Sequence, residues 1–307
     1  MKIEVSIVTP TYNRALLLDR VWKSLKNQKL IFEWIVVDDG STDNTSEVVH
    51  SLEDPRIKYV QLPRNVGVNA ARNAGAKLAK GNFLIFLDSD DELYPHAMAR
   101  MVQVLKESDP SIGAAFFACI AGNTGKQISI MTNGAILDEV DILCRNALKA
   151  EMILIYRIGV IRQYSLPEDL KSCEGLYLRD ISKKYKFLMI NEPGRIYHRQ
   201  GDNISDAESI VGFSNNIAEL YERILINHSD VLTKYPKAKF WHLKKMLYRY
   251  GVAGNRSMVW KTYRRIINQT HSPLEILEST AIFVLGILGS ARFESWRMNF
   301  INSRFGH

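Results

Sequence analysis

The stretch Phe83-Leu84-Ile85-Phe86-Leu87-Asp88-Ser89-Asp90-Asp91 is an apolar run that ends in three carboxylates. A continuous apolar segment that ends at acidic residues is typical of a central parallel strand, buried on both faces. Ligands of open α/β sheets bind beyond the carboxyl ends of the strands, and two acids spaced i, i+2 there suit a divalent cation that bridges phosphate oxygens. An ordinary helix cap in a solvated loop is the alternative for Asp-Ser-Asp.

Three strand patterns, each followed by a polar loop, precede this run. They are Ile3–Thr9 with Pro10-Thr11-Tyr12-Asn13-Arg14, Glu33–Val37 with Asp38-Asp39-Gly40-Ser41-Thr42-Asp43, and Ile57–Leu62 with Asn65-Val66-Gly67. Helical patterns separate them, the last of them over Val68–Lys80. Strands that alternate with helices at this spacing predict an α/β fold with a doubly wound, mostly parallel sheet and helices on both faces.

Four blocks of this region together resemble the inverting glycosyltransferases of family 2, which have the GT-A fold. The blocks are Val8–Arg14, Val36–Asp43, Asn65–Gly67 with Ala71–Gly75, and Phe86–Asp91, in the order found in the family. Each follows the strand or loop that its role requires, so the match is far more specific than any single block. The resemblance implies a nucleotide-sugar donor, and a uridine diphosphate sugar is the expected one.

A nucleotide needs a flat slot for its base and countercharge for its diphosphate. The resemblance places Pro10 and Tyr12 against the base and lets Asp39 accept a hydrogen bond from a pyrimidine imide. Turn formation by Pro10 and helix capping by Asp39 are the structural alternatives, and a solvated helix face is the alternative for Arg72. The residues that we expect to bind the donor are Pro10, Tyr12, Arg14, Asp39, Arg72, Asp88, Ser89 and Arg199.

The same resemblance implies Mn²⁺ or Mg²⁺ as cofactor. Asp90 would bind the metal and Asp88 would lie beside the metal and the ribose, whereas Asp91 would cap a helix that begins near Tyr94. His198 is a further metal candidate, because the segment Arg195–Ser205 resembles the part of the family that closes over the donor. A lone histidine is nevertheless more often structural.

The acceptor side is predicted in the block Leu166–Arg179. Where the family most often has Glu-Asp, with one carboxylate as general base, this chain has Glu174-Gly175. Three interpretations stay open: Glu174 is the base, Asp180 on the same helix takes its place, or the chain has lost activity. A base must lie within roughly 3 Å of the proton that it removes, which sequence spacing does not determine.

The charge of +7 is concentrated in the C-terminal part of the chain. From Val231 to His307 there are 13 lysines and arginines against three acids, so residues 1–230 carry a net charge of −3. We expect a catalytic domain over residues 1–205 and a basic helical region over 206–307. In Pro236–Tyr250 an apolar face lies beside lysines, a pattern that indicates contact with an anionic membrane or packing in a small helical subdomain.

Several classes of protein are disfavoured. No G-x-G-x-x-G follows the first strand, as a dinucleotide-binding oxidoreductase would require, and no nucleic-acid-binding motif accompanies the positive charge. The three cysteines match no metal spacing, and the absence of a signal peptide favours a cytoplasmic location. We therefore expect a metal-dependent inverting glycosyltransferase of bacterial surface polysaccharide synthesis, peripheral on the inner membrane face, with a glycan or lipid-linked saccharide as acceptor. A non-catalytic nucleotide-sugar-binding subunit is the alternative.

Overall fold

The computed structural model of the chain describes residues 2–129, 131–145, 147, 151–170, 174–198, 213–270 and 272–288. The chain divides into two compact units. Unit 1 consists of Met1–Ile142 and Asn146–Gly201, and unit 2 of Leu143–Arg145 and Asp202–His307. The domain boundary expected at residue 205 lies outside the described residues.

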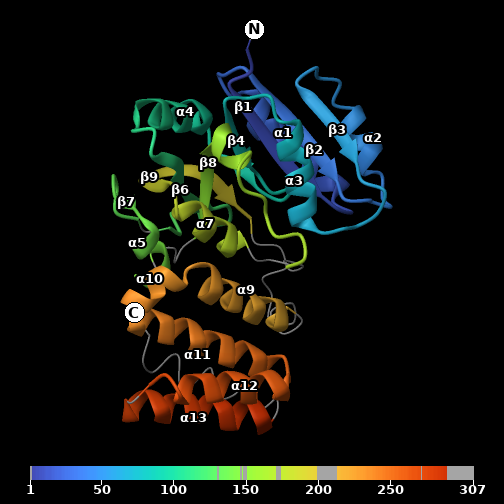
Figure 1. The fold of residues 1–307 in the computed structure, drawn as a ribbon. Coiled ribbons are helices and arrows are strands. Elements are labelled where there is room, and N and C mark those ends of the chain that lie inside the picture. Colours follow the sequence, from blue (N-terminus) through green and yellow to red (C-terminus); the bar gives the residue numbers. More distant parts are fainter. Residues whose placement is uncertain are drawn as a thin grey trace. The chain divides into compact units, whose positions relative to one another are not determined.

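Unit 1 is built on one sheet (Figure 1). Its strands are β1 (Val5–Thr11), β2 (Phe32–Asp38), β3 (Ile57–Gln61), β4 (Phe83–Phe86), β5 (Glu92–Leu93), β6 (Ile112–Ala121), β7 (Ile136–Leu137), β8 (Met152–Arg157) and β9 (Lys186–Tyr197). They run in the order β3-β2-β1-β4-β8-β6-β9-β5, with β7 also paired to β9. The pairs among β1 to β4 and the pair β6–β9 are parallel, whereas β8 is antiparallel to both β4 and β6.

The strands of this sheet are buried on both faces because alternate side chains enter two separate cores. In the run that ends at the acids, Ile85 and Leu87 join one core cluster and Leu84 joins the other. In β1 the same division separates Ile7 from Val8. The expected central strand is therefore confirmed, between β1 and β8.

Helices cover both faces, as predicted. They are α1 (Ala15–Lys26), α2 (Thr45–His50), α3 (Val68–Leu78), α4 (Ala97–Glu107), α5 (Glu139–Cys144), α6 (Ile158–Ile161) and α7 (Glu174–Ser182). α1 and α4 supply apolar side chains to one core, and α3 and α7 supply them to the other. Ala71 of α3 is fully buried, which lets this helix lie close to the sheet.

β9 contains the segment Glu192-Pro193-Gly194, although proline followed by glycine is typical of a turn. The strand continues through this segment to Tyr197. Proline cannot donate a ladder hydrogen bond and is tolerated where a strand is irregular. Pro193 lies at such a place, because the register between β6 and β9 shifts on both sides of the pair Ala118–Pro193.

Unit 2 is helical and contains α9 (Ser214–Asn227), α10 (Ser229–Lys234), α11 (Pro236–Val252), α12 (Arg256–Ile267) and α13 (Pro273–Leu288) (Figure 1). α11 packs against α9, α12 and α13. Its apolar side chains Phe240, Leu243, Leu247 and Tyr250 are buried, so the face that we considered for membrane contact is used for packing within unit 2. Among the described residues, no helix is both long and apolar enough to cross a bilayer.

Candidate active site

Three neighbouring strand ends meet at one edge of the unit 1 sheet. Thr11 of β1 pairs with Asp38 of β2, and Leu87 after β4 donates its N–H to the carbonyl of Val8 in β1 at 3.0 Å. Since these strands are parallel, the loops that begin at Tyr12, at Asp39 and at Asp88 leave the sheet side by side.

The loop after β2 is held by its own acids. Asp39 is only 4% exposed, and its two carboxylate oxygens accept the N–H groups of Val66 and Gly67, both at 2.8 Å. Gly67 has φ +104°, a conformation that favours glycine. The alternative that Asp39 caps a helix is therefore wrong, since its hydrogen bonds join the second strand to the loop before α3. Each oxygen keeps a further lone pair for a ligand.

Pro10 and Tyr12 lie on the two sides of the end of β1. Pro10 is buried within the strand and pairs with Val37 of β2, so it does not form the turn. Tyr12 follows the strand and is 42% exposed. The turn itself falls at Asn13, which has φ 51° and whose side-chain oxygen accepts the N–H of Thr42 at 2.8 Å. A flat ring is thus exposed next to the Asp39 loop.

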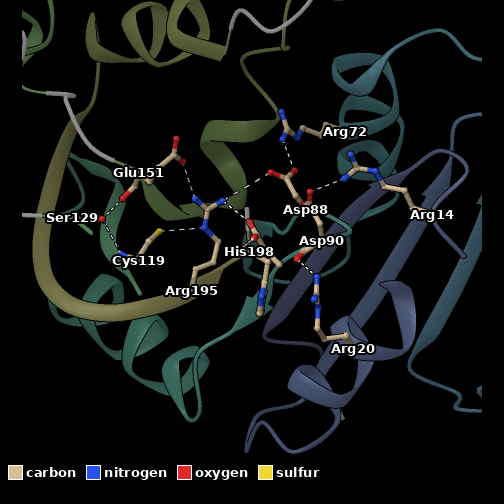
Figure 2. Close-up of polar contacts among 11 residues, drawn as sticks. Arg14, Arg20, Arg72, Asp88, Asp90, Cys119, Ser129, Glu151, Arg195 and His198 are labelled. Atoms are coloured by element: carbon tan, nitrogen blue, oxygen red, sulfur yellow. Dashed lines mark hydrogen bonds and ion pairs between the residues drawn. The ribbon is translucent and has the colours of Figure 1, made fainter. Parts of the chain in front are cut away.

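Arginines pair with both acids of the Asp-Ser-Asp stretch (Figure 2). Nη2 of Arg72 lies 2.6 Å from Oδ1 of Asp88, and Nη1 of Arg14 lies 2.7 Å from Oδ2 of Asp90. Arg20 of α1 donates a third hydrogen bond, to the main-chain carbonyl of Asp90. The edge therefore combines carboxylates for a cation with guanidinium groups for an anion, which is the charge pattern that a metal–diphosphate complex requires.

Asp88 is kept ionised by these charges. Burial by itself would raise the pKa of Asp88, but the positive charges of Arg72 and Arg195 outweigh it, so the pKa lies below its usual value. The Asp88 side chain is still 37% exposed and can be reached by a ligand. Ser89, by contrast, is buried at 4% exposure between the two acids.

Asp91 does not cap a helix. α4 begins at Ala97 with His96 before it and no side-chain cap, and Asp91 instead turns into the protein, where it is 1% exposed. Its oxygens accept a hydrogen bond from the N–H of His198 at 3.1 Å and lie 2.9 Å from Nη1 of Arg195. Burial raises the pKa of Asp91 to about 7 even though the Arg195 charge opposes the shift.

The predicted ligands near the end of β9 are only partly described. His198 places Nε2 2.7 Å from Oε1 of Glu92, which precedes Leu93 in β5. A Cβ atom at Gly122 would lie 2.5 Å from the other side of the His198 ring, so the imidazole is packed as well as hydrogen-bonded. Arg199 lies outside the described residues.

The acceptor-side block is tied to α3. Asn73 exchanges two hydrogen bonds with the main chain of Leu166, and Asn69 donates to the carbonyls of Pro167 and Leu170 at 2.8 and 3.2 Å. The same helix carries Arg72 to the acidic loop. The acidic loop after β4 and the segment 166–170 are therefore both fixed to one helix.

The candidate bases lie on α7, as expected. Glu174 is the first residue of this helix, but its side chain lies outside the described part of the chain. Asp180 lies further along α7 and is partly buried. Gly175, which replaces the expected Asp, has its carbonyl bonded by Arg179 Nη1 at 2.7 Å.

Sequence reasoning assigned no role to Arg20, Asn73 or Arg195. Arg195 is the least expected of them, because a charged side chain in a strand that also contains Lys186 and Glu192 is only 7% exposed. Arg195 carries no local signal that would separate it from these two residues. Its partners come from distant parts of the chain, which spacing does not reveal.

The comparisons with known proteins now decide the family. The model described as "Glycosyl transferase family 2" matches residues 6–166, more than half of the chain. The chain belongs to glycosyltransferase family 2. The expected family and enzyme class are thus confirmed, and this glycosyltransferase carries the four matching blocks within the residues covered by the family model.

Curated relatives match this glycosyltransferase over part of their length. One is the GalNAc(5)-diNAcBac-PP-undecaprenol beta-1,3-glucosyltransferase of Campylobacter jejuni, 38% identical over 41% of this chain and 42% of the relative. An uncharacterized glycosyltransferase of Haemophilus influenzae is 32% identical over 51% of this chain and 63% of the relative. The validoxylamine A glucosyltransferase of Streptomyces hygroscopicus is 52% identical over 28% and 21%. The matched segments thus span less than two thirds of each of these relatives.

Solved structures match nearly the whole chain and establish the GT-A fold. TarS of S. aureus in complex with UDP has a TM-score of 0.59 at 18% identity, covering 97% of this chain and 92% of TarS. The mannosyltransferase PcManGT from Pyrobaculum calidifontis, in complex with GDP-Man and Mn²⁺, has a TM-score of 0.55 at 16% identity, with coverage of 95% and 88%.

Proposed function

We propose that this chain is a metal-dependent inverting glycosyltransferase that moves a sugar from a UDP-sugar to a hydroxyl of a lipid-linked glycan in bacterial surface polysaccharide synthesis. The observation that carries the proposal is the pairing of Asp88 with Arg72 and of Asp90 with Arg14 beside the Asp39 loop. The relative that is named for an undecaprenol-linked substrate supports the acceptor class, and the TarS complexes with UDP and UDP-GlcNAc support the nucleotide.

The residues present fit a divalent metal that arrives with the donor. Within the described part of the chain, no group of three or more His, Cys, Asp and Glu side chains could hold a metal alone. Mg²⁺ sites at phosphates commonly use one or two carboxylates, and substrate oxygens and water supply the rest. Asp90 would hold Mn²⁺ or Mg²⁺ with support from Asp88, and the ion would neutralise charge on the leaving diphosphate. His198 would join them only after leaving Glu92.

The other residues that we assign to the donor and the acceptor have the following roles in this proposal. Asp39 accepts a hydrogen bond from the uracil imide, and the Tyr12 ring together with Pro10 lies against the base. Arg14 and Arg72 exchange their carboxylate partners for diphosphate oxygens when the donor binds, and Arg199 adds a further positive charge. Glu174 removes the proton from the acceptor hydroxyl, which then displaces the diphosphate with inversion; Asp180 is the second candidate for this base.

Unit 2 supplies membrane contact in this proposal. On α12, Arg256, Trp260 and Arg264 follow one another at intervals of four residues, and all three are exposed. On α13, Leu274, Leu277 and Val284 are 56%, 67% and 45% exposed. Aromatic and aliphatic side chains beside arginines are the composition of helices that lie on anionic membranes. The protein would therefore act on the cytoplasmic face of the cell membrane.

The two helices contact each other through aromatic rings. The Trp260 and Phe283 rings lie 5.3 Å apart, and Tyr263 stacks on Phe283 at 4.3 Å. One acid on α13, Glu278, is already paired with Lys244 at 2.5 Å, so its negative charge does not oppose a negatively charged lipid. Each basic residue near an anionic surface contributes about 1 kcal/mol.

Two experiments test the proposal. The first measures sugar transfer to an undecaprenyl-diphosphate-linked saccharide by the amount of UDP released. Transfer should require Mn²⁺ or Mg²⁺ and should be lost in Asp90→Ala. It should be retained in the control Asp19→Ala, whose carboxylate is 52% exposed on α1. Unchanged turnover in Asp90→Ala would overturn the metal assignment. Sedimentation with vesicles of phosphatidylglycerol should be weakened by Leu274→Ser/Leu277→Ser, but not by Ile226→Ser, which alters a residue 63% exposed on α9. Equal binding of both variants would overturn the membrane assignment.

A further inference from the structure

Arg195 is a buried arginine at the centre of the acidic edge, with every guanidinium nitrogen in contact with another side chain (Figure 2). Nη1 lies 2.9 Å from Oδ2 of Asp91 and 4.0 Å from Oδ2 of Asp88. Nη2 lies 3.0 Å from Oε2 of Glu151, and Nε donates to Sγ of Cys119 at 3.2 Å. Burial of the guanidinium charge costs desolvation free energy, and these partners fix the group in one orientation.

An irregularity of β9 aims this side chain at the site. Ala118 of β6 pairs with Pro193, but the next residue, Cys119, pairs with Arg195, so Gly194 is an extra residue on β9. Such bulges re-aim side chains next to functional sites. A Cβ atom at Gly194 would lie 2.7 Å from Cβ of Phe117, so the close approach of the strand there requires glycine.

Asp91 connects Arg195 to the predicted metal-binding acids. Both Asp91 oxygens have partners at the end of β9, one in Arg195 of the strand and the other in the N–H of His198, which follows the strand. The N–H of Asp91 in turn donates to the carbonyl of Asp88 at 3.2 Å, which closes the turn that contains Asp90. The position of this turn therefore depends on the contacts that Arg195 and His198 make with Asp91.

We propose that Arg195 is a positioning residue that holds the Asp88–Asp91 turn through Asp91. Glu151 and Cys119 keep its guanidinium 4.0 Å from Oδ2 of Asp88 and so leave that oxygen available to the metal, while Oδ1 is paired with Arg72. The inference rests on the proposed function, in which Asp88 and Asp90 hold the metal. Lysine would preserve the charge but not the fork that contacts Asp91, Glu151 and Cys119 together. Loss of Glu151 would free the guanidinium to approach Asp88 and compete with the cation.

The test measures Mn²⁺ binding to the full chain with UDP present, from the electron paramagnetic resonance signal of free Mn²⁺. Arg195→Lys and Arg195→Met should each raise the dissociation constant of Mn²⁺ roughly tenfold or more, as expected when a residue behind a metal ligand is lost. Glu151→Ala should raise it by a smaller factor, and this variant should fold because the Glu151 side chain is 57% exposed. UDP binding without metal should be unchanged in all three.

The double variant Arg195→Met/Asp91→Asn separates positioning from stability. At a pH well above 7, where Asp91 is ionised in the wild type, the variant removes both charges of the buried pair and keeps the net charge of the protein. The thermal stability lost in Arg195→Met should then return, because no charge stays buried without its partner, and yet Mn²⁺ binding should stay weak. Arg157→Lys is the control: Arg157 donates to the carbonyls of Ile112 and Ser108 away from the site, and its loss should lower stability alone.

Two outcomes would overturn the inference. Folded Arg195→Lys that binds Mn²⁺ as the wild type does would show that charge suffices, and a double variant with restored Mn²⁺ affinity would show that position does not matter. Failure of the wild type to bind Mn²⁺ with UDP would instead overturn the proposed function.

Discussion

Asn73 of α3 and Leu166 at the start of the acceptor-side block hold each other in both directions. The Leu166 N–H donates to Oδ1 of Asn73, and Nδ2 of Asn73 donates to the Leu166 carbonyl, both at 2.9 Å. Nδ2 also reaches Oε1 of Glu168 at 2.8 Å. One buried side-chain amide therefore joins two segments that lie more than ninety residues apart in the sequence, through the same kind of paired N–H and C=O hydrogen bonds that join two strands.

Asn73→Ala should loosen the acceptor-side segment without affecting the nucleotide. It leaves the buried N–H and C=O groups of Leu166 without these partners, at a cost of about 1–3 kcal/mol for a buried unsatisfied group. We expect a lower free energy of unfolding and a higher KM for the acceptor, with unchanged UDP binding. Steady-state kinetics with varied acceptor measure this, and an unchanged acceptor KM would show that the tie is only structural.

Asp39→Asn should weaken UDP binding. An amide keeps the shape of the side chain but presents an NH₂ group to one of the two N–H donors, Val66 or Gly67, and to the uracil imide. Calorimetric titration with UDP should show an affinity loss of roughly tenfold or more, consistent with about 1.5–3 kcal/mol for a hydrogen bond to a charged group. An unchanged affinity for UDP would show that the uracil ring does not bind at Asp39. Asp54→Asn is the control, since Asp54 pairs with Arg56 after α2.

Glu174→Gln should abolish sugar transfer while leaving UDP binding intact. Loss of a general base lowers the rate by roughly 10²–10⁴-fold, and glutamine keeps the size of the side chain. Asp180→Asn tests the second candidate, and Glu107→Gln on the exposed end of α4 is the control. Transfer that survives in Glu174→Gln and is lost in Asp180→Asn would assign the base to Asp180.

Tyr59→Phe should change how stability depends on pH. Burial and the hydrogen bond to Asp38 at 2.5 Å raise the pKa of Tyr59 to about 12. The folded protein therefore keeps the Tyr59 proton at pH values where the unfolded chain, with the usual pKa of 10, loses it. The contribution of Tyr59 to the free energy of unfolding is complete below pH 10 and is lost as the pH rises toward 12. Denaturant titrations should therefore show a shallower loss of stability in the variant over that range, and parallel curves would contradict the shift.

Gly194→Ala should disturb β9 where Arg195 enters the site. The added Cβ would lie 2.5 Å from Cε of Met101 and 2.7 Å from Cγ2 of Ile153. Overpacking of a core costs about 1–3 kcal/mol, so the midpoint of thermal unfolding should fall. Gly125→Ala in an open turn is a comparison that tests positive φ alone, because no atom lies within 4 Å of its added Cβ. An unchanged midpoint in Gly194→Ala would mean that β9 can shift.

The sheet of unit 1 could be predicted because apolar runs and polar strand ends are local signals. The position of Asp39 and of the pair Asp88 and Asp90 followed from the same reasoning, since parallel strands bring their carboxyl ends to one edge. The cap assigned to Asp91 failed for a physical reason. An acid near a helix start is a local pattern, whereas its actual partner Arg195 arrives from a strand about one hundred residues later.

The C-terminal helices show the same limit. The apolar face of α11 is readable from the sequence, but whether it meets a membrane or other helices depends on α9, α12 and α13. Those helices bury Phe240 and Leu247. The side chains that stay exposed, on α12 and α13, could not be recognised from periodicity, because α13 is apolar on most of its circumference.

The double role of α3 constrains how this enzyme could be re-engineered. Arg72 faces the acidic turn, while Asn69 and Asn73 bind the segment 166–170. A graft that exchanged only that segment to change acceptor preference would inherit a mismatched helix. Chimeras between family members should therefore be cut so that α3 is exchanged together with the segment 166–170, while the loop after β2, for which we propose nucleotide contact, stays with the host.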